Sequence, residues 1–483
     1  MSKRVIYFIL LVLVIADCTY SFNQFKSTTL DGDMAGGIVP ASDVKNVLES
    51  PLGFNAAIYH QTYPNPNRFF SHYIFKAYFS NVPLLLQNNR TPIDSVYLSC
   101  AIAKILMQLF LIILLAMNIS GTKNFFKLDF IIAAILVIPF FQTHGYQGYM
   151  GIIDESTTYS FFYALPLIFL LIYFTPIVDW LFYNRSFSFN LPMRISLLLL
   201  ACLTCLSGPL NPGVILIITC LVFIVAAYTE YKNSKEEGLL EKIKHVISSF
   251  PKKYFFFFLP ISFFALYSIY IGHYNSISNK NLIPLSELYA KLPAGIYYQF
   301  TQKIGFPILF IILTLNSIFI LKLTQDKEGR KILGFLKWTI VFSMIYILLL
   351  PLGGYRNYRP NILRYDTILP ITIGLIFCFG ITSLTLIKTL TKYQLRWYLL
   401  LIALVLFIFT NADTPHFKMN ECEKNSLIEI SEAKEKIIEL KNDCPVLSWK
   451  KITRPQDSEL NAKLLLKWRI IKEPKLYFNG AEK

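Results

Sequence analysis

The carboxylates Asp31 and Asp33 lie two positions apart, shortly beyond the first apolar segment of the chain. At this spacing, two carboxylates in an extended segment or turn can face one centre and supply oxygen ligands to a divalent cation such as Mg²⁺ or Mn²⁺. One of them can instead take a proton from a substrate hydroxyl while the other orients it. Gly32 keeps such a turn open, although Asp-Gly is also ordinary turn chemistry. We predict a catalytic site here, with a solvated turn as the alternative.

A second acidic pair, Asp154 and Glu155, is followed directly by Ser156, Thr157 and Thr158. Asp, Ser and Thr satisfy the free amides at a helix start, so this segment has the composition of a helix cap. The same carboxylates can complete a site with Asp31 and Asp33, and His144 nearby is a further candidate base. Both interpretations are open, and we include Asp154 and Glu155 among the predicted substrate-binding residues.

Arginines and tyrosines alternate in residues 353–366, which we call the arginine segment. It contains Arg356, Arg359, Arg364 and Tyr365. Guanidinium groups bind phosphate and carboxylate in a bidentate manner, and tyrosine rings can stack on sugars. We therefore predict that these four residues bind a pyrophosphate-linked or anionic saccharide. Anchoring in lipid headgroups, or ion pairing with Asp366, is the alternative.

Three further basic residues are predicted to bind substrate. Lys104 lies inside the second apolar segment, where an ammonium group must snorkel to the interface or meet an anion such as a lipid phosphate. Arg68 and His72 belong to an aromatic stretch, residues 63–72, whose composition suits a helix lying along a bilayer surface.

The composition is that of a membrane protein. Hydrophobic residues make up 54% of the 483 residues and charged residues only 16%, well below the roughly 25% charged residues of soluble domains. Apolar runs long enough to cross a bilayer predict about eleven spans. The predicted spans are Val5–Tyr20, Ser95–Met117, Leu128–Gln142, Tyr159–Trp180, Ile195–Leu206, Val214–Tyr228, Tyr254–Gly272, Gly305–Leu321, Trp338–Leu352, Thr367–Ile387 and Trp397–Thr410. The predicted fold is therefore an all-α, polytopic transmembrane helix bundle.

Lys and Arg recur on every second connection, as cytoplasmic loops require. The net charge of +16 therefore reflects membrane topology, and we predict no nucleic-acid partner. The amino terminus is then cytoplasmic, behind an uncleaved signal anchor of a multi-pass plasma (inner) membrane protein. The predicted site residues fall on the opposite, extracytoplasmic side, in the first loop (21–94), the second loop (143–158) and the arginine segment.

Apolar runs stop near Asn411, so we divide the chain into a transmembrane domain (1–410) and a small extracytoplasmic soluble tail (411–483). The tail contains Cys422 and Cys444, which flank a helix-like stretch from Ser426 to Leu440. We predict a disulfide between these two cysteines. Cysteines elsewhere lie in or beside apolar spans, where free Cys packs as a small hydrophobe.

Together these features resemble the membrane glycosyltransferases of the GT-C superfamily. The resemblance rests on the anchor helix, the Asp31-Gly32-Asp33 motif opening a long first loop with surface-lying helices, the second acidic loop, and the Arg364-Tyr365 step before a late span. It covers about the first 400 residues. It implies a polyprenyl-phosphate-linked sugar donor, a catalytic base or metal ligand at Asp31 or Asp33, and a second acid at Asp154 or Glu155.

We therefore expect sugar transfer to a saccharide or lipid acceptor of the cell envelope. The alternatives are a polymerase or ligase of lipid-linked polysaccharide, which needs the arginines without the acid pair, and a non-enzymatic lipid or saccharide transporter. The enzymatic interpretation requires Asp31, Asp33, the second acidic pair and Arg364 to converge at one membrane boundary.

Overall fold

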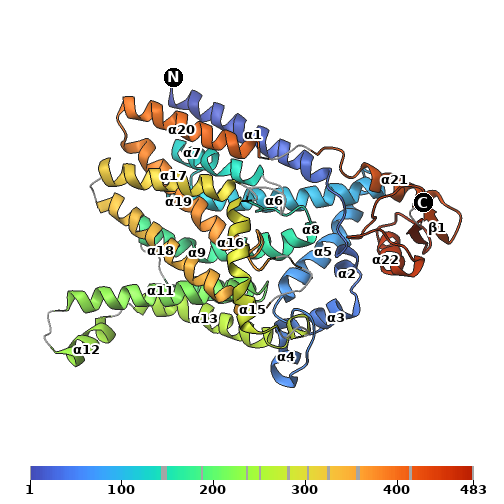
Figure 1. Ribbon diagram of the computed structural model, residues 1–483, viewed down its shortest axis with the longest axis horizontal. Helices are drawn as coiled ribbons and strands as arrows, with labels where there is room; N and C mark the ends of the chain where they lie inside the picture. Colours follow the sequence, from blue (N-terminus) through green and yellow to red (C-terminus); the bar gives the residue numbers. More distant parts are fainter. Residues whose placement is uncertain are drawn as a thin grey trace.

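Long helices run side by side through the molecule, and a small domain sits at one end of them (Figure 1). The computed structural model describes residues 2–142, 150–185, 189–234, 238–249, 252–279, 283–301, 304–323, 327–354, 359, 361–412 and 416–480. We call the end of the bundle that carries α21 and α22 the tail end (Figure 1). The first loop also lies there.

Within these described ranges, nine helical segments are long and apolar enough to cross a membrane. They comprise α1 (Lys3–Lys26), α6 (Pro92–Ser120), the segment Thr157–Tyr183 formed by α8 (Thr157–Tyr159), η3 (Ser160–Ala164) and α9 (Leu165–Tyr183), α11 (Leu210–Asn233), α13 (Lys252–Gly272), α17 (Gly305–Leu323), α18 (Lys327–Leu349), α19 (Leu369–Thr389) and α20 (Lys392–Thr410). Two shorter apolar segments are α7 (Leu128–Val137) with η2 (Ile138–Gln142), and α10 (Leu191–Cys205). The chain is thus a helical membrane protein, and the count of eleven spans stays a prediction.

The helices differ in how deeply they are enclosed. In the most apolar stretch of α19, 83% of the residues are buried inside the protein, whereas in that of α1 only 6% are buried. The outer helices therefore present apolar side chains such as Phe8 and Val12 at the surface, as a lipid-facing helix must. Inside the bundle, Asn316 donates to Thr382 Oγ1 (2.9 Å) and Ser383 Oγ (3.1 Å). Tyr398 donates to Asn316 Oδ1 (3.0 Å), so this buried polar cluster joins α17, α19 and α20.

The first loop is largely helical. It contains α2 (Met34–Ile38), α3 (Ser42–Glu49), η1 (Pro51–Gly53), α4 (Phe54–Tyr59) and α5 (Phe69–Leu86). Helix α5 packs on α6 and α2, so the first loop is a folded part of the tail end. Other short helices are α12 (Leu239–Ser249), α14 (Ser276–Asn279), α15 (Leu285–Ala290), α16 (Leu292–Thr301) and η4 (Leu350–Gly353).

The tail contains α21 (Glu421–Glu432), β1 (Ile437–Leu440), η5 (Pro455–Ser458), α22 (Glu459–Lys467) and β2 (Leu476–Asn479). The helix-like interpretation of residues 426–440 is therefore wrong beyond Glu432. The backbone becomes extended at Ala433, and β1 pairs in parallel with β2, which places Ile437 opposite Leu476. The partner strand lies almost forty residues later, so local periodicity could not reveal it. The predicted disulfide is confirmed: Cys422 and Cys444 are bonded.

The tail packs firmly onto the membrane domain. Buried Glu423 accepts hydrogen bonds from Leu30 N (2.8 Å), Tyr97 Oη (2.7 Å) and Leu447 N (2.9 Å). Trp468 Nε1 donates to the Phe79 carbonyl (2.9 Å). The change in composition near residue 411 therefore does not mark a separation in space.

Replacing Cys422 with Ser should destabilise the tail by about 3 kcal/mol, because the open chain regains the loop entropy that the bond removes. Faster proteolysis between residues 416 and 480 under native conditions would report this loss. Cys220→Ser is the matched control, since Cys220 is an exposed free thiol in α11. Equal cleavage rates in the two variants would contradict the prediction.

Candidate functional site

Asp31 joins the first loop to the second. Its buried carboxylate accepts hydrogen bonds from Thr158 N (3.0 Å), Thr158 Oγ1 (2.7 Å) and Asp33 N (3.1 Å). Thr158 belongs to α8, so Asp31 satisfies a free amide at the start of this helical segment from a distant part of the sequence. Asp31 is therefore a positioning residue in this geometry, and its oxygens are engaged by the chain's own donors.

Asp33 has a different environment, because its side chain is exposed at the N-cap position of α2. Of the two predicted catalytic acids, Asp33 is exposed to solvent and Asp31 is buried. Within the described ranges, no group of three or more His, Cys, Asp or Glu residues is arranged to hold a metal ion. The interpretation of Asp31 and Asp33 as metal ligands stays a prediction, and the hydrogen bonds to Asp31 do not favour it.

The segment at the second acidic pair forms the predicted helix cap, with Ser156 as the cap residue. Asp154 Oδ1 accepts from Ser156 N (2.8 Å), and Ser156 Oγ accepts from Tyr159 N (3.2 Å). Burial raises the pKa of the Asp154 carboxyl to about 8, and the nearby charge of Asp366 acts in the same direction, whereas the hydrogen bond from Ser156 N opposes the shift. The Asp154 carboxyl is therefore largely protonated at neutral pH.

Lys104 neither snorkels nor faces lipid. Its ammonium is fully buried and donates to the carbonyl oxygen of Glu155 and to Thr28 Oγ1 (3.1 Å). From the sequence we expect Lys104 to snorkel or to meet an anion such as a lipid phosphate, whereas the structure supplies two protein acceptors. This contact links the first and second loops and explains the buried charge without a substrate.

The described part of the arginine segment makes two distinct contacts. Arg364 forms a bidentate pair with buried Asp366, at 2.9 and 2.8 Å, which is the ion pairing considered as the alternative. Arg359 Nη2 donates to Tyr159 Oη (2.6 Å), and its guanidinium lies 5.4 Å from the Tyr159 ring centroid. Tyr365 is buried, and Arg356 lies outside the described residues.

Arg68 and His72 meet the same helical segment from the first loop. The Arg68 guanidinium lies 4.8 Å from the Phe162 ring centroid and 5.7 Å from that of Tyr163. The His72 ring packs against Phe162, with centroids 4.7 Å apart. Burial lowers the pKa of His72 to about 3, and the charge of Arg68 adds to this effect. The imidazole is therefore neutral, and neither of its buried nitrogens has a hydrogen-bond partner among the described residues.

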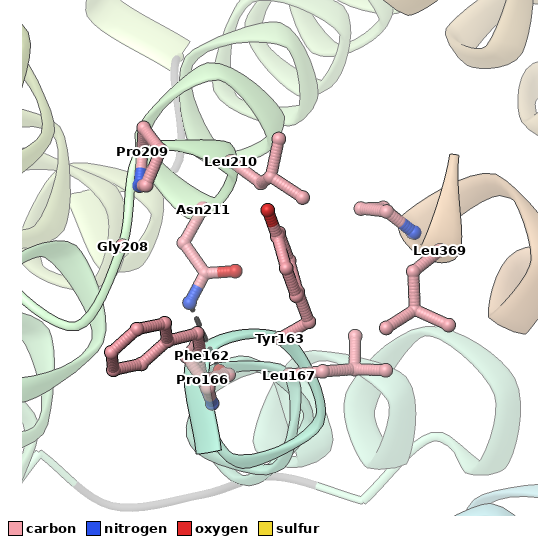
Figure 2. Close-up of a pocket in the computed structure, with 10 residues that line it drawn as sticks. Phe162, Tyr163, Pro166, Leu167, Gly208, Pro209, Leu210, Asn211 and Leu369 are labelled. Atoms are coloured by element: carbon pink, nitrogen blue, oxygen red, sulfur yellow. Dashed lines mark hydrogen bonds between the residues drawn. The ribbon is translucent and has the colours of Figure 1, made fainter. Parts of the chain in front are cut away.

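A small apolar pocket lies beside these residues (Figure 2). Its lining comes from three segments: Phe162, Tyr163, Pro166 and Leu167, then Gly208, Pro209, Leu210 and Asn211, then Leu369 and Pro370. The Asn211 amide donates to the Pro166 carbonyl (2.9 Å), which holds two of these segments together. Residues 208–211 carry no motif that indicates binding, so the sequence analysis did not predict their part in the pocket.

Aromatic rings connect this pocket to Gly32. Tyr163 contacts Tyr159 edge-on at 6.1 Å, and Tyr159 stacks on Trp449 of the tail at 5.6 Å and 28°. A Cβ atom on Gly32 would lie 2.6 Å from Trp449 Cδ1. We call Phe162, Tyr163, Tyr159 and Trp449 the aromatic row. No local motif marks Trp449, so the sequence analysis did not predict it.

Asp154→Asn should raise stability at neutral and alkaline pH. In the unfolded chain this carboxyl has the ordinary pKa of 3.8, so raising it to about 8 makes folding less favourable as pH rises through that window. Asparagine keeps the oxygen that Ser156 N needs and never ionises. Thermal unfolding should show no gain near pH 4 and a gain of a few degrees by pH 8. An unchanged difference between these pH values would contradict the assignment.

Gly32→Ala should displace Trp449, because the new Cβ would also lie 2.6 Å from Trp449 N, a backbone atom that cannot rotate away. We expect a loss of about 1–3 kcal/mol, typical of overpacking, measured as a lower unfolding temperature. Gly36→Ala is the control, since a Cβ there meets only ordinary contacts at 3.8 and 3.9 Å. Equal unfolding temperatures for the two variants would exclude the clash.

The structure thus brings together residues from the first loop, the second loop and the arginine segment. Asp31 contacts Thr158, Lys104 contacts Glu155, and Asp154 experiences the charge of Asp366, the partner of Arg364. Arg68, His72 and Arg359 lie along the aromatic row. No protein-family model matches this chain, and no curated protein is significantly similar to it.

Proposed function

We propose that this protein is a membrane glycosyltransferase that moves a sugar from a polyprenyl-phosphate-linked donor to a saccharide or lipid acceptor. The observation that carries the proposal is the aromatic row, which has Arg68 and Arg359 beside it, an apolar pocket at one end and the Asp31 to Asp33 segment at the other. In this proposal the pocket contacts the lipid, the arginines bind the phosphate, the aromatic rings stack on the sugar, and Asp33 faces the acceptor hydroxyl.

The pocket and the two arginines suit the donor. Apart from the Asn211 amide and the Tyr163 hydroxyl, the side chains that line this small pocket are apolar, so we propose that it contacts one end of the donor's hydrocarbon chain. A Cβ atom on Gly208, one of the lining residues, would lie 3.9 Å from Arg68 Nε. The guanidinium group of Arg68 therefore lies at the edge of the pocket. Guanidinium groups are favourable partners for phosphate oxygens. Arg359, farther along the row, is the second candidate for the phosphate.

Asp33 is the proposed base. It is exposed and adjacent to the residue that contacts Trp449, whereas Asp31 holds the loop in place. In the proposed step, the acceptor oxygen bonds to the anomeric carbon and the bond from that carbon to the phosphate oxygen breaks. The acceptor proton passes to Asp33, and the arginines stabilise the phosphate that leaves.

The metal alternative fits this geometry less well, because both oxygens of Asp31 already accept hydrogen bonds from protein donors. The step proposed here assigns no role to Mg²⁺ or Mn²⁺. The orientation of the site follows from charge, since Lys and Arg concentrate on the connections that alternate with those of the site. We propose that the tail end faces the extracytoplasmic side of the plasma (inner) membrane.

The second candidate is a polymerase or ligase of lipid-linked polysaccharide. The structural role of Asp31 and the arginines beside the aromatic row favour it, because such an enzyme can act without an acid pair. The two candidates share the donor chemistry and differ in their need for Asp33.

Asp33→Asn separates them. In proteoliposomes supplied with labelled lipid-linked sugars from a membrane extract, we expect sugar transfer to fall at least 100-fold, the lower range for loss of a general base. Binding of undecaprenyl phosphate should stay unchanged, because the arginines that hold it are intact. Asp43→Asn is the matched control, since Asp43 is also an exposed acid in the first loop.

Arg359→Lys tests the phosphate contact in the same preparation, because it keeps the charge and removes the planar fork. Weaker binding of undecaprenyl phosphate is expected. Retained transfer in Asp33→Asn with lost binding in Arg359→Lys would favour the polymerase or ligase. Wild-type protein that neither binds undecaprenyl phosphate nor transfers sugar would contradict both candidates.

A further inference from the structure

Trp449 is a large aromatic side chain that is positioned by the protein and still open to solvent. Its indole is 53% exposed, although it stacks on Tyr159 and lies against Gly32. The packing of the protein does not require a half-exposed indole at this position, because an apolar ring that buries so little surface contributes little free energy to folding. A rigid, accessible ring beside an exposed acid is a surface that a ligand can use.

The backbone around Trp449 is fixed by one carboxylate. Glu423 accepts from Leu447 N and from Leu30 N, and these residues lie two positions before Trp449 and Gly32 respectively. Leu447 has a left-handed backbone, with φ of 49°, which a leucine rarely adopts. The Asn461 amide also donates to the Leu447 carbonyl (3.2 Å). The tail therefore holds Trp449 against the Asp31 to Asp33 segment at a cost in backbone strain.

The chemistry around the indole matches a pyranose ring. A flat aromatic face packs on the C–H groups of a sugar, while carboxylates and arginines at its edge bond to hydroxyl or anionic substituents. Tyr159 extends the aromatic surface, Arg359 binds its hydroxyl, and Asp33 stands next to Gly32. The donor surface begins at the other end of the aromatic row, at the pocket, so the Trp449 end is left for a second saccharide.

We propose that Trp449 forms the acceptor subsite and stacks on a pyranose ring whose hydroxyl then faces Asp33. The proposal rests on the glycosyltransferase function proposed above and adds that the acceptor is a saccharide recognised jointly by the tail and the first loop. The tail is therefore a part of the active site. Tryptophans at membrane boundaries also anchor proteins in headgroups, and the experiment distinguishes that role.

The test measures saccharide binding directly, without catalysis. Purified full-length protein in detergent is applied to an immobilised panel of glucose, mannose, galactose and N-acetylhexosamine trisaccharides. The wild type should bind one or more members, and Trp449→Ala should weaken that binding about tenfold or more, in line with the loss of one ring stack. Trp449→Phe should retain part of the affinity because it keeps an aromatic face.

Trp397→Ala is the matched control, since Trp397 is also exposed, at 62%, but belongs to α20, which supplies none of the residues of the aromatic row or the pocket. It should bind the panel as the wild type does. Unfolding temperatures of all variants, and their binding of undecaprenyl phosphate, verify that the fold and donor surface are intact.

Two results would overturn the proposal: no member of the panel binds to the wild type, or Trp449→Ala binds as tightly as the wild type. A headgroup anchor would give the second result. If Trp449-dependent saccharide binding is present but sugar transfer is not, the subsite stands and the proposed transferase function fails.

Discussion

Buried carboxylates determine the arrangement of the tail end. Removing a carboxylate from water is expensive unless hydrogen-bond donors replace the solvent, so each buried acid dictates which segments surround it. Asp31 gathers the first loop and the start of α8, and Glu423 gathers Leu30, Tyr97 and Leu447. Both acids take their donors from segments far apart in the sequence, and this gives the loops and the tail a defined relative position.

This constraint gives the three residues of the Asp31-Gly32-Asp33 motif different environments. Asp31 is committed to Thr158, whereas Asp33, two residues later, is exposed. Gly32 between them admits Trp449 at a distance that no side chain would allow. The three residues of the Asp-Gly-Asp motif therefore have different roles. Asp31 caps the start of α8 from a distant part of the same chain, Gly32 allows the close approach of the tail, and Asp33 is an exposed acid.

The basic residues divide in a similar way. Lys104 and Arg364 are engaged with protein acceptors at Glu155 and Asp366, so their charges stabilise the framework. Arg68 and Arg359 instead lie over aromatic rings along the row that links the pocket to Trp449. Stacked guanidinium groups keep donors at their edges for a phosphate, which is why the proposed donor surface follows the aromatic row.

Several features could be read from the amino-acid sequence, because they depend on local composition: the helical membrane class, the apolar segments, and the pairing of the two tail cysteines. The cap at Asp154 to Thr158 and the pairing of Arg364 with Asp366 were recognisable as alternatives, because each pair of partners is close in the chain. The roles of Asp31 and Lys104, the strand at Ile437 to Leu440, and the place of Trp449 depend on partners that are distant in sequence. Only the tertiary structure decides such contacts, since hydrogen-bond partners and ring stacks are selected by proximity in space and leave no period or spacing in the chain.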